Sequence, residues 1–258
     1  MIADMHCHVD LYPDFIGVAQ EAATKGIWIL AVTTTPNAWQ GTRERLSAFQ
    51  NIQVAIGLHP ELAHARAQEL PIMERFVPSS AFVGEVGLDG SPAYRQYAGI
   101  QQKVFKHILH VCQEAGGKVL SIHSRRAAAE VLSCLEERRE CGIPILHWFT
   151  GSKAELDSAK RLDCWFSVGP QLLQTPAGIE RVSLMPRERL LLETDGPFGK
   201  VNDQILRPTA VHQTISMLAQ IWRVSQEDAR LQVEDNQQAI WRFAGVETSL
   251  KSTTGYGS

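Results

Sequence analysis

Residues 2–8 read Ile-Ala-Asp-Met-His-Cys-His, a short apolar run that ends in two histidines separated by one residue. Side chains two apart on a β-strand point to the same side, whereas on a helix they would lie about 200° apart. A strand therefore lets His6 and His8 bind one metal ion and directs Cys7 toward the packing between sheet and helices. A His-x-His pair alone is a weak signal, so its meaning depends on what the rest of the chain supplies.

Four later apolar runs end in the same way, with a histidine or a carboxylate, and their terminal residues are Glu85, His123, His147 and Asp195. Any one of these could be a satisfied core or turn residue, but that account needs five coincidences. Alternation along the strands places Val83 with Glu85, Ser121 with His123, and Ile145 with His147 on one face each. The pattern predicts a metal site where these faces meet.

The chain alternates short apolar or β-branched runs with segments of helical periodicity. The expected strands are residues 2–6, 28–33, 52–58, 81–86, 118–123, 143–148, 164–168 and 190–193. The expected helices include residues 15–24, 95–114, 127–139, 154–161, 209–222 and 225–243, whereas 170–186 shows no clear helix. Eight such units predict an α/β fold, a (β/α)₈ TIM barrel, with its active site at the C-terminal ends of the strands. An open doubly wound sheet with a helical cap is the alternative.

Composition excludes several classes of protein. The 258 residues are 44% hydrophobic and 21% charged, which is enough apolar material for a large core and argues against disorder. No run approaches the roughly 18 apolar residues of a membrane helix, and no leader is evident, so we expect a cytoplasmic protein. The net charge of −3 argues against a protein that coats nucleic acid. Five cysteines without a Cys-x-x-Cys spacing predict buried, reduced thiols.

The domain organisation expected from these patterns is simple. Residues 1–246 form one TIM-barrel hydrolase domain, and residues 247–258, rich in Ser, Thr and Gly, form a flexible C-terminal tail. A single closed barrel also explains how residues 6 and 195 reach one site.

Four imidazoles and two carboxylates are too many ligands for one tetrahedral zinc site. They fit two divalent metal ions that share a bridging carboxylate, with zinc, manganese or cobalt suited to mixed N/O ligands and magnesium less natural. Two metals about 3.5–4 Å apart are the arrangement used in phosphoester and amide hydrolysis. The residues therefore predict a metal-dependent hydrolase.

Six blocks of sequence resemble the TatD-type metal-dependent deoxyribonucleases of the amidohydrolase superfamily. They are residues 4–10 (Asp-Met-His-Cys-His-Val-Asp), 57–60 (Gly-Leu-His-Pro), 84–89 (Gly-Glu-Val-Gly-Leu-Asp), 123–125 (His-Ser-Arg), 147–151 (His-Trp-Phe-Thr-Gly) and 193–197 (Glu-Thr-Asp-Gly-Pro). They follow the family's order and spread over most of the chain. Trp148, Gly196 and residues 31–36 look most similar to the TatD-like nuclease subunit of the Qat anti-phage defence systems.

The resemblance implies a TIM barrel of the metallo-dependent hydrolase type and assigns the ligands. One metal is implied on His6, His8, Glu85 and Asp195, and a second on Glu85, His123 and His147, with Glu85 bridging. It also implies hydrolysis of DNA phosphodiesters, on single strands or from a 3′ end, with Asp195 accepting the proton of the attacking water. The implied partners are DNA and, by the narrower resemblance, other subunits of a Qat-type system.

Two departures from the family pattern concern the substrate. Glu61 stands where many relatives have a second histidine, and residues 198–203 replace a basic block that follows the strand-eight aspartate. Groups that grip phosphate are therefore depleted although the ligand set is intact. Two alternatives stay open: an amidohydrolase-type hydrolase of a small lactone, amide or amine, and a regulatory or scaffold subunit of a defence complex.

Several nearby residues have two interpretations each. His59 is expected to touch substrate phosphate or to make a structural hydrogen bond in its His-Pro turn, and Arg125 to grip phosphate or to face solvent. Asp10 would orient a strand-one histidine or cap the next helix, and Glu193 should face inward with a partner. Trp148 and Phe149 would stack on a base or pack under their loop.

Overall fold

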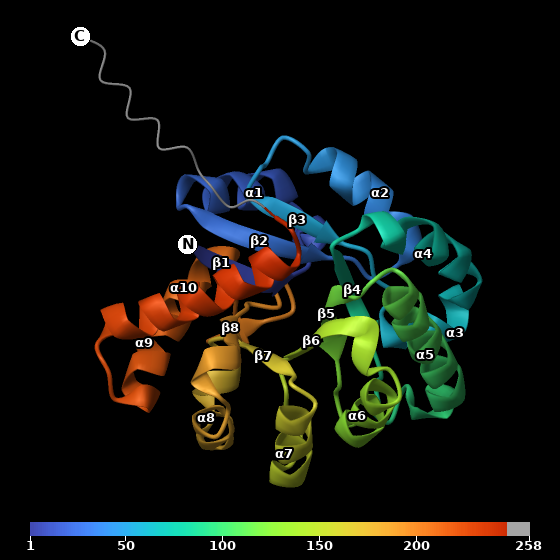
Figure 1. Ribbon diagram of the computed structural model, residues 1–258. Helices are drawn as coiled ribbons and strands as arrows, with labels where there is room; N and C mark the ends of the chain where they lie inside the picture. The colour runs from blue at the N-terminus through green and yellow to red at the C-terminus, as the bar shows by residue number, and fades with distance from the viewer. Residues whose placement is uncertain (247–258) are drawn as a thin grey trace.

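The computed structural model describes residues 1–246, and the predicted tail, residues 247–258, lies outside the described part. Eight parallel strands alternate with helices in these residues (Figure 1). The strands are β1 (Ile2–Cys7), β2 (Ile27–Val32), β3 (Ile52–Ala55), β4 (Phe82–Gly87), β5 (Lys118–His123), β6 (Gly142–His147), β7 (Trp165–Val168) and β8 (Leu190–Leu192). Every strand end agrees with the expected span to within one residue, except that β3 ends at Ala55, three residues before the expected end.

The strands close into a barrel rather than an open sheet. Continuous parallel pairing runs from β1 to β3 and from β4 to β8. A parallel bridge between Ile56 and Val83 joins β3 to β4. At the other seam, the Asp195 amide donates to the His6 carbonyl over 2.9 Å, which links the end of β8 to β1. The predicted TIM barrel is therefore confirmed.

Helices surround the strands (Figure 1). They are α1 (Phe15–Thr24), α2 (Pro36–Arg45), α3 (Ala63–Arg66), α4 (Leu70–Phe76), α5 (Ala98–Glu114), α6 (Ala128–Glu136), α7 (Lys153–Arg161), α8 (Pro176–Ser183), α9 (Val211–Trp222) and α10 (Gln226–Phe243). Among the helices that the structure describes, none combines the length and apolarity needed to cross a bilayer.

One helix lies where the sequence showed no clear one. Helix α8 occupies the middle of residues 170–186, with Thr175 at its N-cap accepting from the Gly178 amide and Pro176 in its first turn. The helix has only two turns and buries only Gly178 and Val182. A stretch this short shows little periodicity, although the Thr-Pro pair is a start signal that the sequence does carry.

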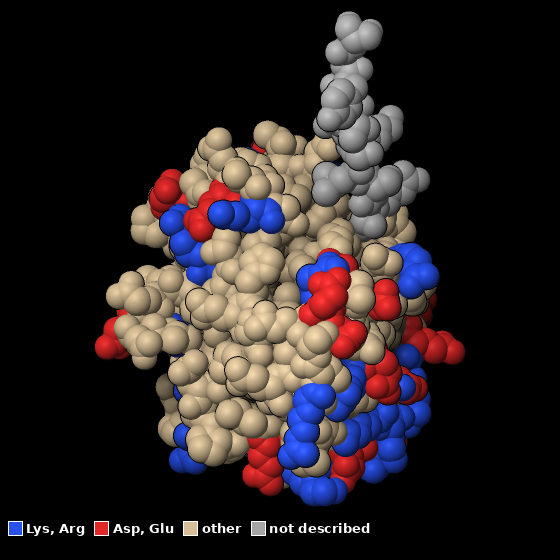
Figure 2. Space-filling view, turned by 90° about the vertical axis from the view of Figure 1, so that its left-hand side faces the viewer, with Lys and Arg blue, Asp and Glu red and all other residues tan. Residues whose placement is uncertain are grey.

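Charge is mixed on the surface that Figure 2 shows. Lysine and arginine lie beside aspartate and glutamate near the edges of this face, and uncharged residues cover its middle. The described residues form no continuous basic stripe on this face, which agrees with the net charge of −3.

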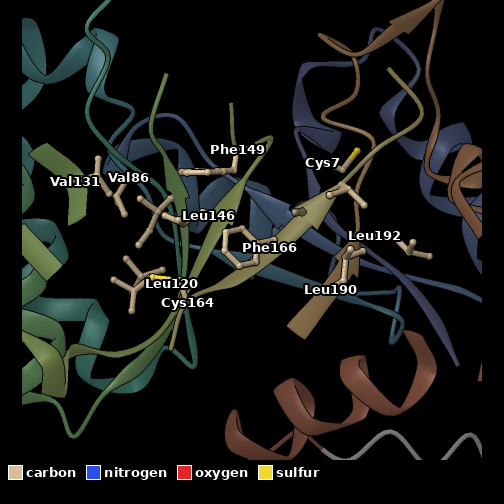
Figure 3. Packing of buried hydrophobic residues seen from close by; sticks show 14 of the residues in the cluster. Cys7, Val86, Leu120, Val131, Leu146, Phe149, Cys164, Phe166, Leu190 and Leu192 are labelled. Atoms are coloured by element: carbon tan, nitrogen blue, oxygen red, sulfur yellow. The ribbon is translucent and has the colours of Figure 1, made fainter. Parts of the chain in front are cut away.

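The outer hydrophobic layer lies between the strands and the surrounding helices. Figure 3 shows part of it, with Leu120, Leu146 and Phe166 contributed by the adjacent strands β5, β6 and β7. All five cysteines belong to this layer, where each is buried and unpaired: Cys7, Cys112, Cys134, Cys141 and Cys164. Burial raises the pKa of Cys141 to about 11 and that of Cys164 to about 12, which keeps these thiols protonated.

The inner hydrophobic layer fills the barrel and is closed at one end by α10. Trp241 packs against Trp28 and Phe82, with ring centroids 5.5 and 5.1 Å away. Gln237 satisfies both backbone groups of Ala3, at 3.0 and 2.7 Å, so the start of β1 is capped by a side-chain amide. Because this N-terminal end is sealed, a site that reaches solvent has to lie at the C-terminal ends of the strands.

Candidate metal centre

The structure brings all six predicted ligands to the C-terminal ends of the strands. His6 lies on β1 and His8 just after it, and Glu85, His123 and His147 lie on β4, β5 and β6. Asp195 lies in the loop after β8. Most of them line a cavity of about 620 Å³ that opens at this end of the barrel. Residues 6 and 195, far apart in sequence, meet here because the barrel closes between β8 and β1.

Four ligand atoms form a first group. His6 Nε2 lies 3.5 Å from both Glu85 Oε2 and Asp195 Oδ1, and His8 Nε2 lies 3.1 and 3.6 Å from the same oxygens. Four atoms placed tetrahedrally at about 2.1 Å from one ion are about 3.4 Å from each other. The spacing therefore fits a single divalent cation.

The other oxygen of Glu85 belongs to a second group. Glu85 Oε1 lies 2.8 Å from His123 Nδ1 and 2.9 Å from His147 Nε2, and these two nitrogens are 3.3 Å apart. Glu85 thus turns one oxygen to each pair of histidines, which is the geometry of a bridging carboxylate. Three overlapping triplets have ligand atoms all within 4.8 Å of one another, and each contains His6 or Glu85: His6–Glu85–His147, His6–His8–Asp195 and His59–Glu85–His123.

His6 supplies a test of whether a cation fits. Its Nδ1 makes a 2.7 Å hydrogen bond with the Ser121 hydroxyl, and its buried Nε2 has no hydrogen-bond partner among the described residues. This orphaned nitrogen faces two carboxylate oxygens. Buried polar atoms are rarely left unpaired, and a cation between the nitrogen and the carboxylates satisfies all three.

The electrostatics of the group agree with that fit. Burial alone would raise the pKa of Glu85, but the imidazoles of His59, His147 and His6 hold it well below its ordinary range. Burial raises the pKa of Asp195 in spite of the histidines beside it. A positive ion shared by both carboxylates would favour their ionised forms and offset the desolvation that burial imposes.

Irregular backbone directs these side chains into the site. The pairing of β4 with β5 shifts register between Val83 and Val86, and both valines lie in the outer hydrophobic layer. The expectation that Val83 shares a face with Glu85 is therefore wrong: the shift, rather than simple alternation, points Glu85 inward. Asp195 adopts a left-handed backbone with φ 51° and is held by its hydrogen bond to His6.

Asp89 is a site residue that sequence reasoning missed. Its Oδ2 lies 2.8 Å from His123 Nε2, while the opposite ring nitrogen faces Glu85. Burial opposes protonation of His123, but the hydrogen bonds to Asp89 and Glu85 raise its pKa to about 9. Asp89 therefore orients the ring and directs Nδ1 to the metal centre. Its place at the end of the block 84–89 pointed to a role in the site. Because Asp89 follows the strand, alternation along the strand could not predict where its side chain points.

Two predicted supporting carboxylates have different outcomes. Glu193 faces inward as expected: it accepts from the Trp148 amide over 2.9 Å and from the Ser167 hydroxyl. Asp10 is not the cap of α1, because Asp14 holds that position, and its carboxylate accepts from Thr42 Oγ1 over 3.2 Å.

The predicted substrate-binding residues both lie at the cavity. His59 makes its turn hydrogen bond through Nδ1, which accepts from the Glu61 amide over 3.2 Å, and places Nε2 3.3 Å from Glu85 Oε1. Arg125 lines the cavity and is exposed there. Trp148 also lines the cavity, whereas Phe149 is fully buried against Phe166 and packs under the loop.

A TIM barrel that buries imidazoles and carboxylates together at its C-terminal mouth fits the class of metal-dependent hydrolases. This chain belongs to the TatD related DNase family, whose sequence model matches residues 3–242.

Individual relatives cover nearly the whole chain. YcfH of Escherichia coli K12, named an uncharacterized metal-dependent hydrolase, is 28% identical over 258 residues, covering 91% of this chain and 93% of YcfH. The 3′-5′ ssDNA/RNA exonuclease TatD of Edwardsiella piscicida is 27% identical over 249 residues, covering 90% and 94%. The crystal structure of YjjV, a TatD homolog from E. coli K12, matches with a TM-score of 0.84 at 23% identity, covering 93% and 97%.

Proposed function

We propose that this protein is a two-metal hydrolase of nucleic-acid phosphodiesters, with residues 1–246 acting as one domain. His6, His8, Glu85 and Asp195 would hold one divalent ion, and Glu85, His123 and His147 the second. The proposal is supported mainly by the geometry of Glu85: each of its two carboxylate oxygens faces a separate pair of imidazoles, at distances of 2.8–3.5 Å.

The residues divide the work of hydrolysis. Two ions held by these residues would supply electrophilic catalysis and would lower the pKa of the attacking water. Asp195, at the cavity wall, would accept the proton of that water, and Glu85 would contribute one oxygen to each ion. Asp89 and Ser121 hold the rings of His123 and His6 in the orientation that presents one nitrogen to each ion. His59 and Arg125, which both line the cavity, would contact the phosphate.

Two observations support a nucleic-acid substrate. The chain belongs to a family whose members include the named exonuclease from Edwardsiella piscicida. The cavity, at about 620 Å³, has the size of a site for a small molecule, so it suits a strand end or a single strand rather than the side of a duplex. With a net charge of −3, the protein would hold DNA at its metals rather than coat it.

The test combines metal analysis with a substrate panel. Purified protein is analysed for its metals and then incubated with Mn²⁺ or Mg²⁺ and end-labelled single-stranded DNA, nicked duplex or RNA. We expect cleavage by wild type and a large loss in His123→Ala. Absence of cleavage with every metal, or equal cleavage by both proteins, would sink the proposal.

Small molecules added to the same panel separate the alternative substrate. The described residues that line the cavity include Glu61 and one arginine but no lysine. These side chains provide little positive charge for binding phosphates. Turnover of a lactone, cyclic amide or acylated amine without DNA cleavage would favour a small-molecule hydrolase.

We further propose a cytoplasmic role in anti-phage defence, supported by the resemblance of Trp148, Gly196 and residues 31–36 to the Qat nuclease subunit. The protein would then work with other subunits of that system. In cells that carry the complete system, Asp195→Asn should abolish protection while assembly is unchanged. Protection that persists in Asp195→Asn would instead indicate a scaffold role.

A further inference from the structure

Phe198 is an exposed aromatic residue at the wall of the metal-centre cavity. Its side chain is 57% exposed, the largest fraction among the large hydrophobic side chains of the described residues. Its ring lies edge-to-face with the His8 ring, with centroids 5.1 Å apart and planes at 83°. More than half of the side chain is therefore open to solvent, although the ring contacts His8.

Single exposed hydrophobic residues are common on protein surfaces and by themselves mean little. Phe198 differs because its backbone is held in place. The Gly199 amide donates to the Asp195 carbonyl over 2.8 Å, and the Leu206 amide donates to the Gly199 carbonyl over 2.9 Å. A Cβ at Gly199 would collide with the Thr194 carbonyl, so the chain is packed closely here. The ring is thus presented on ordered backbone beside a proposed ligand, which lowers the entropic cost of binding to it.

The chemistry of the cavity indicates what the ring would contact. Among the described lining residues Arg125 is the one permanent cation, and Glu61 adds a negative charge. Residues 198–203 contain one cation, Lys200, which is not among the residues that line the cavity, so charge contributes little to substrate affinity on this side of the site. An uncharged contact has to replace it, and every nucleobase offers a flat π-face to an aromatic ring.

We propose that Phe198 is the stacking platform for the nucleobase next to the phosphate at the metal centre. This inference rests on the proposed function and deepens it, because it assigns binding of the base to Phe198 and binding of the phosphate to the metal centre and Arg125. Trp148 lines the same cavity from the loop after β6 and adds a second aromatic side chain to its wall.

The first experiment measures binding to the metal-loaded protein by calorimetry. The two probes are deoxyadenosine 5′-monophosphate and 2-deoxyribose 5-phosphate, which differ by the base. We expect wild type to bind the nucleotide about 5- to 150-fold more tightly, the range of base–aromatic stacking. Phe198→Ala should lose this preference, and Phe198→Trp should keep it. Ile205→Ala is the matched control, because Ile205 is 52% exposed on β10 (Gln204–Ile205), outside the cavity lining.

The second experiment measures hydrolysis of single-stranded DNA. Phe198→Ala should raise KM by a similar factor and leave kcat nearly unchanged, since the ring touches the base and not the reacting atoms. The factor should be equal at low and high salt, whereas the loss in Arg125→Ala should shrink as salt screens its charge.

The outcomes separate the two proposals. If DNA is cleaved but Phe198→Ala keeps the nucleotide preference, or Ile205→Ala loses it equally, the stacking platform is wrong and the nuclease stands. If wild type binds the nucleotide through Phe198 but cleaves no nucleic acid, the nuclease is wrong and the platform stands. If neither binding preference nor cleavage is found, both fall.

Discussion

The two ends of the barrel differ in the side chains that they bury: one end is apolar, and the other is rich in ionisable groups. At the N-terminal end, Trp241 of α10 covers an apolar interior, and the amides of Asn236 and Gln237 satisfy the backbone of β8 and β1. At the C-terminal end, imidazoles and carboxylates are buried side by side, and His6 Nε2 lacks a partner among the described residues. The polar groups named at the N-terminal end are satisfied within the protein. The buried ionisable groups at the C-terminal end are those of a binding site.

The difference shows where stability and function are separated in this fold. Apolar burial at the closed end stabilises the protein without any ligand. Buried ionisable groups at the open end are costly unless they are paired or bound to a metal. Substitutions at the closed end should therefore change the free energy of unfolding, and those at the open end should change catalysis and metal binding.

The largest expected effect comes from Glu85→Gln at the open end. The amide removes the charge that both ligand groups share, so we expect kcat/KM on single-stranded DNA to fall roughly 10⁴-fold. Metal content per protein should fall in the same samples, as measured by elemental analysis. Glu136→Gln, on the exposed side of α6, is the control and should match wild type. Full activity in Glu85→Gln would contradict the bridging role.

The next effect is at the closed end. Trp241→Ala removes the ring that contacts Trp28 and Phe82 and should lower the free energy of unfolding by about 3–5 kcal/mol. Denaturant titration measures this loss. Activity per folded molecule should be kept, because the ring lies at the opposite end from the ligands. Phe243→Ala, on the same helix but 49% exposed, should change stability by less than about 0.5 kcal/mol.

Removal of the metals tests both ends together. The metals are first removed with a chelator. Each divalent ion that is then added back at 100 times its Kd should raise the free energy of unfolding by about 2.7 kcal/mol. We expect the same increment in Trp241→Ala, because distant sites contribute additively. Glu85→Gln should show little of it. An increment that vanished in Trp241→Ala would show that the two ends are coupled.

The smallest expected effect is that of Asp89→Asn. The amide would keep the shape of the side chain but lose the charge that faces His123 Nε2, so metal affinity or activity should fall about 10- to 100-fold. Competition with a chelator measures the affinity, and Asp235→Asn on the exposed side of α10 is the control. A loss as large as that of Glu85→Gln would indicate that Asp89 is itself a ligand.

The strands and the meeting of the six proposed ligands at one end of the barrel were predictable because their signals are local. An apolar run followed by a histidine or carboxylate is visible within eight residues, as at 118–123 and 143–147. The barrel then follows from counting such units and from the rule that parallel strands present their C-terminal ends together. Helix α8 was missed because two turns carry little periodicity.

Details that depend on pairing between distant segments were not predictable. Alternation placed Val83 on the same face as Glu85, but β4 shifts its register against β5, and only the neighbouring strand decides that. Asp10 was a candidate cap of the next helix, yet Asp14 caps α1 and the carboxylate of Asp10 accepts from Thr42 on α2. Asp89 contacts His123, which is 34 residues away in the sequence. Asp89 lies in a loop, and the path of a loop cannot be read from a periodic sequence pattern.

The sequence by itself determined which residue types end each strand, and therefore the class of chemistry and the family. Only the tertiary structure decided that Glu85 divides its oxygens between two sets of imidazoles, that His6 keeps one nitrogen unpaired among the described residues, and that Phe198 stands beside His8. The reason is physical: residue identity and alternation act over a few residues along the chain. Distances between ligands are set by barrel closure, by register shifts and by loops that meet only after the chain has folded.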